Sequence, residues 1–340
     1  MKALAIRLAR VFSSRKVMTE RCSTIAGLSG QANAALSNAA GSVATQNGGG
    51  EHGHVGMVVD DIVVAGATPL FMTDYIACGV VVPERIAAIV EGIAQAATEC
   101  DVSLIGGETA EHPGLLGPDE YDVAGAATGV VEHDQMLRSE TVVPGDVVLA
   151  LSSSGLHSNG FSLVRKIVAD AGWSYDTEIP DFSGPLGVEL LEPTRLYTKA
   201  LVGVLSAHPG AIRVLSHVTG GGIAQNLSRV LPPHVAVDVD RSTWTPTPIM
   251  QVLARAAGFN LERVEDTWNM GIGMLAVVDQ ARAADITQAL ENSGHTTWQV
   301  GEVREISAAD HEGAVTSAKG VEGGAVTLVS GYADSSSARS

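Results

Sequence analysis

The sequence is poor in the residues that several classes of protein need. Only 3 of its 340 residues are cysteines, and Cys22, Cys78 and Cys100 show no Cys-x-x-Cys spacing. A disulfide framework or a zinc site is therefore not indicated, and a reducing cytoplasm is the expected location. No apolar run approaches the roughly 20 residues of a membrane-spanning helix, so no membrane partner is expected.

Basic residues are also scarce, with 21 Lys and Arg against 38 Asp and Glu and a formal net charge of -17. Nucleic-acid binders need basic patches, so this class is disfavoured and a small-molecule partner is expected. The Walker A pattern GxxxxGK[ST] is absent as well, which disfavours a P-loop nucleotide hydrolase.

The first 50 residues differ in charge from the rest of the chain. They contain one acid, Glu20, and six basic residues: Lys2, Arg7, Arg10, Arg15, Lys16 and Arg21. The opening MKALAIRLARVFSSRKV is typical either of an organelle transit peptide or of a short surface helix. The following stretch, rich in Gly, Ala, Ser and Asn, buries little apolar area. We expect residues 1–55 to form a poorly ordered arm.

From Val55 onwards, helix and strand patterns alternate. An apolar stripe with helical spacing ends near Gly66, and Pro83 suits the first turn of a second helix. Further helices are expected after Asn159 and over 220–232, 248–258 and 279–294, with strands over 69–79, 101–107, 121–132, 143–155 and 271–279. This alternation predicts an α/β or α+β chain of two domains with a break near 132–144, and a frayed tail after Ser307.

Two acidic motifs are candidate metal-nucleotide sites. VVDDIVVAGATP places Asp60 and Asp61 in an apolar helix, where a buried charge must be paired or bound to metal. The alternative is that the acids face solvent, and since adjacent helix residues lie about 100° apart, at least one is expected to do so. GGETAEHPG suggests a glycine-lined turn in which Glu108 ligates a metal and backbone N–H groups approach phosphate. A simple strand-to-loop connection with charged tips remains open.

Two further motifs are candidate anion sites, and a third places a polar residue where it can line a cleft. LSSSGLHSNGFSLVRK places hydroxyls and His157 before a helix start, where an imidazole can bind phosphate or transfer a proton; a capped helix with an exposed histidine is the alternative. SHVTGGGIAQN opens a helix with three glycines, which suits either anion approach or a tight turn. EDTWNMGIGM places the polar Asn269 before a buried strand. Together with the acidic motifs, these suggest phosphoryl transfer to a phosphorylated substrate.

The motifs, taken in order, resemble one family. GMVVDDIVVAGATPLFMTDYIACG, LIGGETAEHPG, YDVAGAATGVVE, SSSGLHSNGFSLVRK, LLEPTRLY, HVTGGGIAQNL and WNMGIGM are similar to phosphoribosylformylglycinamidine cyclo-ligase, also called aminoimidazole ribonucleotide synthetase. The resemblance runs from about Gly56 to roughly Val303. It implies an N-terminal sheet-plus-helices domain over 56–140 that pairs in a homodimer barrel and holds the ATP site. It also implies a C-terminal mixed-sheet α/β substrate domain over 141–306, followed by a flexible tail over 307–340.

The resemblance also implies the roles of individual residues. Closure of formylglycinamidine ribonucleotide to aminoimidazole ribonucleotide would use ATP and Mg²⁺, with phosphorylation of the formyl (amide) oxygen. Asp61 and Glu108 would serve the Mg²⁺-ATP site, and Gly106, Gly107 and Thr109 would shape its wall. His157 would handle a proton. The substrate would be held by Ser154, Gly155, Ser158, Asn159, Gly220, Gly221, Gly222 and Asn269.

One departure from the family pattern bears on activity. Family members carry an Asp-Gly-Val-Gly-Thr-Lys loop upstream of the VVDD helix, and residues 1–55 contain nothing similar. We expect these residues not to represent the family's N-terminus, because of a frameshift, a wrong start or a gene rearrangement. Two alternatives to the cyclo-ligase follow: an inactive or binding-only remnant, and a related ATP-dependent small-molecule kinase.

Overall fold

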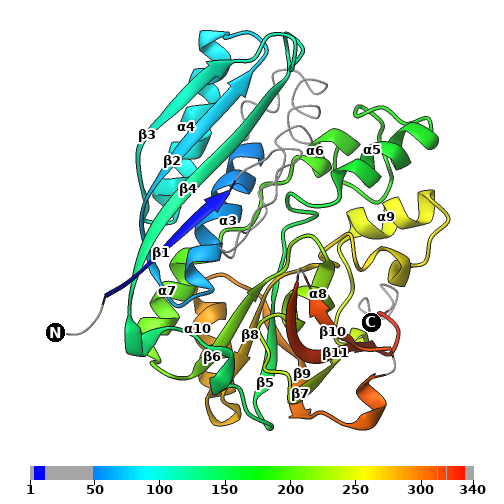
Figure 1. Ribbon diagram of the computed structural model, residues 1–340. Helices are drawn as coiled ribbons and strands as arrows, with labels where there is room; N and C mark the ends of the chain where they lie inside the picture. The colour runs from blue at the N-terminus through cyan, green and yellow to red at the C-terminus, as the bar shows by residue number, and fades with distance from the viewer. Residues whose placement is uncertain (1–3, 12–48, 312, 319, 334–340) are drawn as a thin grey trace. The chain divides into compact units, whose positions relative to one another are not determined.

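The computed structural model describes residues 4–11, 49–311, 313–318 and 320–333 (Figure 1). The chain divides into two compact units. Unit 1 comprises residues 1–63, 67–134 and 161–199, and unit 2 comprises residues 64–66, 135–160 and 200–340. The boundary between 134 and 135 falls within the break expected from the sequence, whereas the return of 161–199 to unit 1 is not visible in the sequence pattern.

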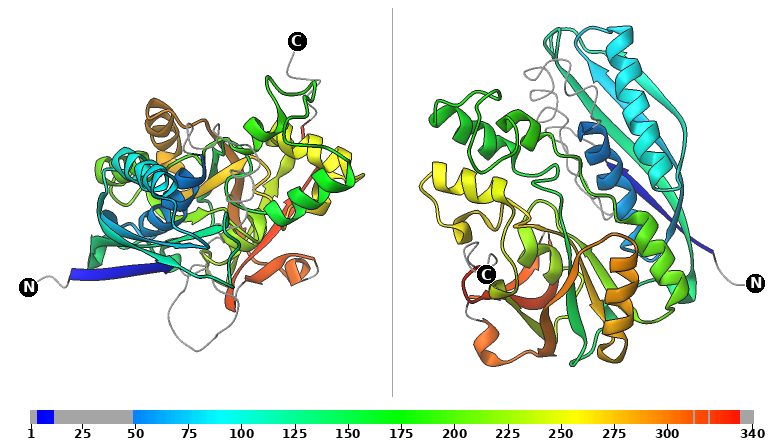
Figure 2. Two further views of the ribbon diagram at one scale, coloured as in Figure 1. Left: turned by 90° about the horizontal axis from the view of Figure 1, so that it is seen from above. Right: turned by 180° about the vertical axis from the view of Figure 1, so that it is seen from behind.

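Unit 1 contains a sheet whose described strands run in the order β1-β4-β2-β3. Its elements are β1 (Leu4–Val11), α3 (Gly49–Val63), β2 (Thr68–Cys78), α4 (Pro83–Glu99), β3 (Ser103–Glu111), β4 (Tyr121–Glu132), α5 (Phe161–Asp170) and α6 (Leu186–Leu190). Helices α3 and α4 lie on one face of the sheet (Figure 2). The apolar stripe of α3 is buried there, with Val55, Val58 and Ile62 fully enclosed.

Unit 2 is built on a mixed sheet with the described strand order β10-β11-β7-β9-β5-β8-β6. Its strands are β5 (Val147–Ser152), β6 (Ile212–His217), β7 (Val235–Asp240), β8 (Ile272–Val278), β9 (Thr297–Glu305), β10 (Val315–Ala318) and β11 (Val321–Val329). Its helices are α8 (Gly222–Ser228), α9 (Pro248–Ala256) and α10 (Ala283–Asn292), and α7 (Thr198–Ala207) crosses from unit 1. Short 3₁₀ turns occupy His133–Gln135, Ser139–Thr141, Arg241–Thr243, Leu261–Val264, Gln280–Arg282 and Ala308–His311.

The two-domain α/β class expected from the sequence is confirmed, and three local expectations differ from the structure. The opening segment, interpreted as a helix or transit peptide, contains strand β1, which pairs antiparallel with β4. Its Leu4, Ile6 and Leu8 alternate with period two, which suits a strand. Helix α3 begins at Gly49, within the expected arm. The segment after Ser307 contains β10 and β11, and β11 pairs parallel with β7.

Among the described residues, no helix is long and apolar enough to cross a membrane. Much of the arm expected over 1–55 lies outside the described residues.

Candidate functional site

The two acids of helix α3 are both buried, so the expectation that at least one faces solvent is wrong. Asp60 is fully enclosed, and its Oδ1 accepts hydrogen bonds from the Thr198 hydroxyl at 2.7 Å and the Tyr197 N–H at 3.2 Å. Tyr197 and Thr198, near the end of unit 1, therefore cover the face of α3 that carries Asp60. Asp60 has a structural role, because its charge is stabilised by these two donors.

Asp61, the residue expected to bind metal, is 5% exposed. It lies on the same helix as Asp60, α3. Its metal role stays a prediction.

The Gly106–Thr109 motif forms part of strand β3, so the expected glycine-lined turn is wrong. Pairing with β2 shifts by one residue between the Met72–Leu104 and Asp74–Gly107 pairs, which places a β-bulge at Gly106. Gly106 has φ +155°. Glu108 is exposed on the same strand, and Thr109 follows it. The sequence pattern missed the continuation because glycines are uncommon inside strands.

Asp74 on β2 is a candidate site residue that the sequence analysis did not single out. It is 8% exposed and lies between the inward-facing Met72 and Ile76. A Cβ on Gly107 would overlap Asp74 Oδ1, so the glycine leaves space for this carboxylate. Burial raises the pKa of Asp74, and its Oδ2 makes no hydrogen bond to any described residue. In the sequence, Asp74 could have been found as an acid at a position where the alternating strand pattern places a buried residue.

The carboxylates of unit 1 suit a hard divalent cation. Asp61 and Asp74 are buried on α3 and β2, elements that pack together, and the Asp74 Oδ2, which lacks a hydrogen bond to any described residue, is an oxygen that a cation would stabilise. No group of three or more His, Cys, Asp or Glu side chains in the described part of the chain is arranged to hold a metal. A magnesium ion here would rely on few carboxylates and on nucleotide phosphates, as is usual for Mg²⁺.

Glu111 and His112, which the sequence left without a role, make local structural contacts. Glu111 Oε1 accepts a hydrogen bond of 2.6 Å from the Val81 N–H, and a ring nitrogen of His112 lies 2.9 Å from the Tyr75 hydroxyl. Both contacts fix the ends of β2 and β3.

In unit 2, the loop after β5 is organised around His157. This residue is 6% exposed, so the alternative of an exposed histidine is wrong. Its φ of +54° lies in the left-handed region, which is uncommon for a residue other than glycine and often marks a functional site. The Ser154 N–H donates to His157 Nε2 at 3.2 Å, so the neutral ring carries its proton on Nδ1.

Asn269 contacts this loop, and its role in holding the substrate stays a prediction. Its Nδ2 donates to the Gly155 carbonyl at 2.9 Å, and its Oδ1 lies 3.1 Å from the Ser153 hydroxyl. The Asn269 side chain is 1% exposed, so it holds the loop from its buried side.

The three glycines after β6 form a turn beside the same loop. Gly221 and Gly222 have φ values of +104° and +68°. A Cβ on Gly220 would lie 3.7 Å from Asn159 Oδ1, which brings the two motifs together. Asn226, a buried residue that the sequence analysis missed, donates to the Gly222 carbonyl at 2.7 Å and to the Thr219 carbonyl at 3.1 Å. Ser154, Gly155, Ser158, Asn159, Gly220, Gly221, Gly222 and Asn269 thus all lie in unit 2.

Comparisons with known proteins agree with this arrangement. Residues 34–131 match the family model "AIR synthase related protein, N-terminal domain", and residues 143–309 match its C-terminal counterpart. The phosphoribosylformylglycinamidine cyclo-ligase of Geobacillus thermodenitrificans is 45% identical over 252 residues, which cover 74% of this chain and 72% of the relative. The chain belongs to the phosphoribosylformylglycinamidine cyclo-ligase family. It is therefore a member of an enzyme family of purine biosynthesis.

The cyclo-ligase of Brevibacillus brevis is 43% identical over 251 residues, with the same 74% and 72% coverage. The N-terminal family match begins at residue 34, upstream of Gly56, where the motifs quoted above begin. Its first part lies outside the described residues.

Solved structures of more distant proteins share the cyclo-ligase fold. Thiamine-monophosphate kinase from Stenotrophomonas maltophilia aligns with a TM-score of 0.61 at 17% identity, covering 98% of this chain and 87% of that chain. A hydrogenase maturation protein HypE in complex with ATP aligns with a TM-score of 0.58 at 16% identity, covering 83% and 77%. At these identities the likeness shows the fold alone.

Proposed function

We propose that this chain catalyses the ATP-dependent closure of formylglycinamidine ribonucleotide to aminoimidazole ribonucleotide. The observation that carries the proposal is the 45% identity over 252 residues to a curated cyclo-ligase. The two family matches, over 34–131 and 143–309, contain the acidic motifs of unit 1 and the polar loops of unit 2. ATP transfers its γ-phosphoryl group to the formyl oxygen of the substrate, leaving ADP. The amidine-side nitrogen then attacks the formyl carbon, the C–O bond breaks, and inorganic phosphate leaves with that oxygen.

Unit 1 supplies the nucleotide side of this reaction. Asp61 and Glu108 hold the Mg²⁺-ATP, with Gly106, Gly107 and Thr109 as its wall, and we add Asp74 to this set. The support for Asp74 is its buried Oδ2, which makes no hydrogen bond to any described residue, while its Oδ1 lies against Gly107. Bound Mg²⁺ would offset the phosphate charge, and the carboxylates of this chain orient the phosphates for in-line transfer.

Unit 2 supplies the phosphoribosyl side. Ser154, Gly155, Ser158, Asn159, Asn269 and the glycines 220–222 bind the substrate through hydroxyl, amide and backbone donors. His157 accepts at Nε2 the proton that the attacking nitrogen releases, and Nε2 gives up its hydrogen bond from the Ser154 N–H in that step. Its buried ring and the fixed Ser154 N–H to Nε2 bond support an oriented imidazole with a defined tautomer.

The chain acts as a homodimer in this proposal. The face of the unit 1 sheet opposite α3 and α4 exposes Leu70 at 42% and Tyr75 at 37%, and the edge strand β3 exposes Ile105 at 61%. Among the described strands, β3 has no partner on its outer edge, and apolar side chains beside such an edge are features of a surface that pairs with a second sheet.

The test is an assay of the purified chain with formylglycinamidine ribonucleotide and Mg²⁺-ATP. We expect aminoimidazole ribonucleotide, ADP and phosphate in equal amounts. Substrate binding without turnover would instead identify a binding-only remnant, and a phosphorylated product without ring closure would identify a kinase.

The variant Asp61→Ala tests whether Asp61 binds the metal-nucleotide, independently of substrate binding. We expect it to abolish nucleotide binding, measured by isothermal titration with Mg²⁺ and ATP, and to leave substrate binding intact. An unchanged ATP affinity would show that Asp61 is not a ligand of the metal-nucleotide.

A further inference from the structure

The triple-glycine turn of unit 2 rests on the backbone of Glu265 and Asp266. The Gly221 N–H donates to the Asp266 carbonyl at 3.2 Å. A Cβ on Gly222 would overlap the Glu265 carbonyl oxygen, so the two backbone segments are in direct contact. The position of the turn therefore depends on where Glu265 is held.

Three donors fix the Glu265 carboxylate. Arg241 binds it with both arms of its guanidinium, Nε to Oε1 at 2.5 Å and Nη2 to Oε2 at 2.8 Å. The Tyr332 hydroxyl donates to Oε1 at 2.6 Å. The side chains of Arg241 and Glu265 are each only 13% exposed, where such bidentate pairs have a well-defined geometry.

The same network includes the C-terminal segment that follows β11. Arg241 Nη1 donates to the Leu328 carbonyl at 2.6 Å and to the Ser330 carbonyl at 3.1 Å. Arg241 thus uses every guanidinium nitrogen, two on Glu265 and one on the end of β11.

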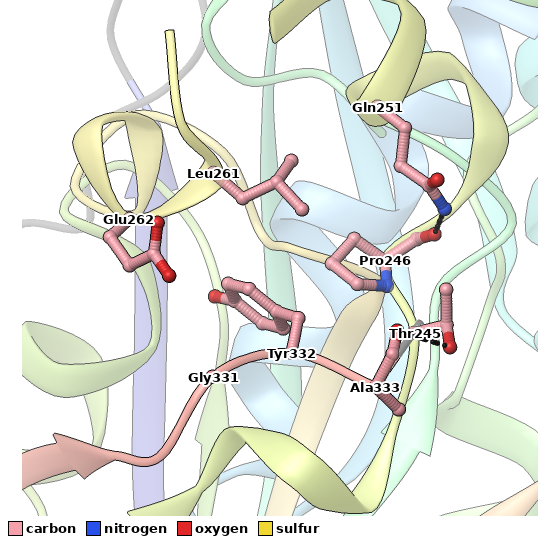
Figure 3. Close-up of a pocket in the computed structure, with 8 residues that line it drawn as sticks. All are labelled: Thr245, Pro246, Gln251, Leu261, Glu262, Gly331, Tyr332 and Ala333. Atoms are coloured by element: carbon pink, nitrogen blue, oxygen red, sulfur yellow. Dashed lines mark hydrogen bonds between the residues drawn. The ribbon is translucent and has the colours of Figure 1, made fainter. Parts of the chain in front are cut away.

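Tyr332 is itself held in place by packing. Its ring meets Trp244 edge-on with centroids 5.4 Å apart, and the Ala333 N–H donates to the Trp244 carbonyl at 3.2 Å. Figure 3 shows Gly331, Tyr332 and Ala333 along one wall of a pocket of about 290 Å³, with Pro246 and Leu261 near the Tyr332 ring. Burial raises the pKa of Tyr332, so its hydroxyl remains a donor at neutral pH.

We propose that Arg241, Glu265 and Tyr332, here called the Glu265 network, are positioning residues that hold the Gly220–Gly222 turn in its substrate-binding conformation. The segment Leu328–Ala333 at the end of the described chain thereby sets the affinity for the phosphoribosyl substrate. This inference rests on the proposed function, because it assumes that the turn binds that substrate. A small displacement of a binding turn is costly, since binding geometry is sharply defined.

The test compares two conservative variants with a matched control. Tyr332→Phe removes one hydroxyl, and Arg241→Lys keeps the charge but removes the two-armed contact. Arg304→Lys is the control, because Arg304 makes a similar network in the same unit, and its hydrogen bonds go to Asp238, Asp310 and the Glu305 carbonyl. Thermal unfolding of all three variants shows whether each folds.

We expect Tyr332→Phe and Arg241→Lys to raise KM for formylglycinamidine ribonucleotide roughly tenfold, with KM for ATP unchanged. Arg304→Lys should change neither. An unchanged substrate KM in both network variants, or an equal rise in Arg304→Lys, would overturn the proposal. Absence of turnover in the unaltered chain would count against the proposed function and not against the network.

A second measurement needs no activity. Hydrogen–deuterium exchange of the peptide over residues 218–223 should be faster in Tyr332→Phe than in the unaltered chain, while exchange in β8 stays the same. Identical exchange in the turn would show that the Glu265 network does not hold it, whatever the chain catalyses.

Discussion

Two glycine-rich stretches that look alike in the sequence have different structural roles. Gly106 and Gly107 lie inside the bulged strand β3, and the space beside Gly107 is filled by the carboxylate of Asp74. Gly221 and Gly222 form a turn with positive φ values, and the space beside Gly222 is filled by the Glu265 carbonyl. At Gly107, the missing side chain leaves space for a carboxylate that can rotate away. At Gly222, it leaves space for a backbone carbonyl that cannot move. The comparison predicts a graded series of substitutions.

The largest effect is expected for Gly222→Ala. The added methyl group overlaps the Glu265 carbonyl and must adopt φ near +68°, so we expect a loss of about 4 kcal/mol in unfolding free energy. Chemical denaturation measures this loss. Gly220→Ala is the matched control, since its nearest neighbour is Asn159 Oδ1 at 3.7 Å, and a comparable loss there would contradict the steric explanation.

A smaller loss is expected for Gly107→Ala, about 2 kcal/mol, because the Asp74 carboxylate can rotate away from the new methyl group. That rotation should also raise KM for ATP and leave KM for the phosphoribosyl substrate unchanged. Gly184→Ala, in the same unit, serves as the control, since nothing lies within 4 Å of its Cβ position and its φ is not positive. Equal changes in the two KM values would show that Gly107 supports the whole fold and not the nucleotide side.

Asp74→Asn tests the carboxylate directly and should stabilise the protein by about 1 kcal/mol at pH 7. Because burial raises the pKa of Asp74, its ionised form is disfavoured in the folded state at neutral pH, and a neutral amide removes that cost. ATP affinity should fall in the same variant. A gain in stability with normal ATP binding would remove Asp74 from the site, and a loss of stability would contradict the unfavourable charge.

The smallest effect on stability is expected from His54, whose side chain lies close to Gly125. The Nε2 of His54 lies 2.5 Å from the Cβ position of Gly125, and burial lowers the pKa of His54 to about 4. The unfolded chain binds a proton near pH 6.5 and the folded chain does not, so stability should fall as pH drops from 6.5 towards 4. We expect a loss of about 1 kcal/mol between pH 6.5 and 5.5, which His54→Leu should reduce. An unchanged pH slope in that variant would rule out His54 as its source.

The sequence predicted the elements of unit 1 and unit 2 where local signals are strong. The stripe from Val55 to Val63 and the proline at the start of α4 were sufficient for two helices, and both are present. The strand expected over 101–107 ended too early, because local patterns do not show that β3 continues to Glu111 past a bulge and a side chain from the neighbouring strand. The same limit applies to β11, whose pairing with β7 joins residues far apart in the chain.

The candidate site divides in the same way. Asn269 and the loop around His157 were chosen from their polar residues beside buried strands, and the structure brings them into contact. Asp74, Asn226 and Glu265 were missed, because each acts through a partner that only tertiary structure supplies. Asp74 contacts the backbone of a glycine on the neighbouring strand, and Glu265 supports a turn some forty residues away (Gly222 to Glu265).

The central claim, that phosphorylation of the formyl oxygen precedes ring closure, is tested most directly by isotope transfer. Formylglycinamidine ribonucleotide labelled with ¹⁸O at the formyl oxygen is incubated with the chain and Mg²⁺-ATP, and the released phosphate is analysed by mass spectrometry. The account predicts one ¹⁸O atom in each inorganic phosphate released. Label appearing in water, with unlabelled phosphate, would contradict it.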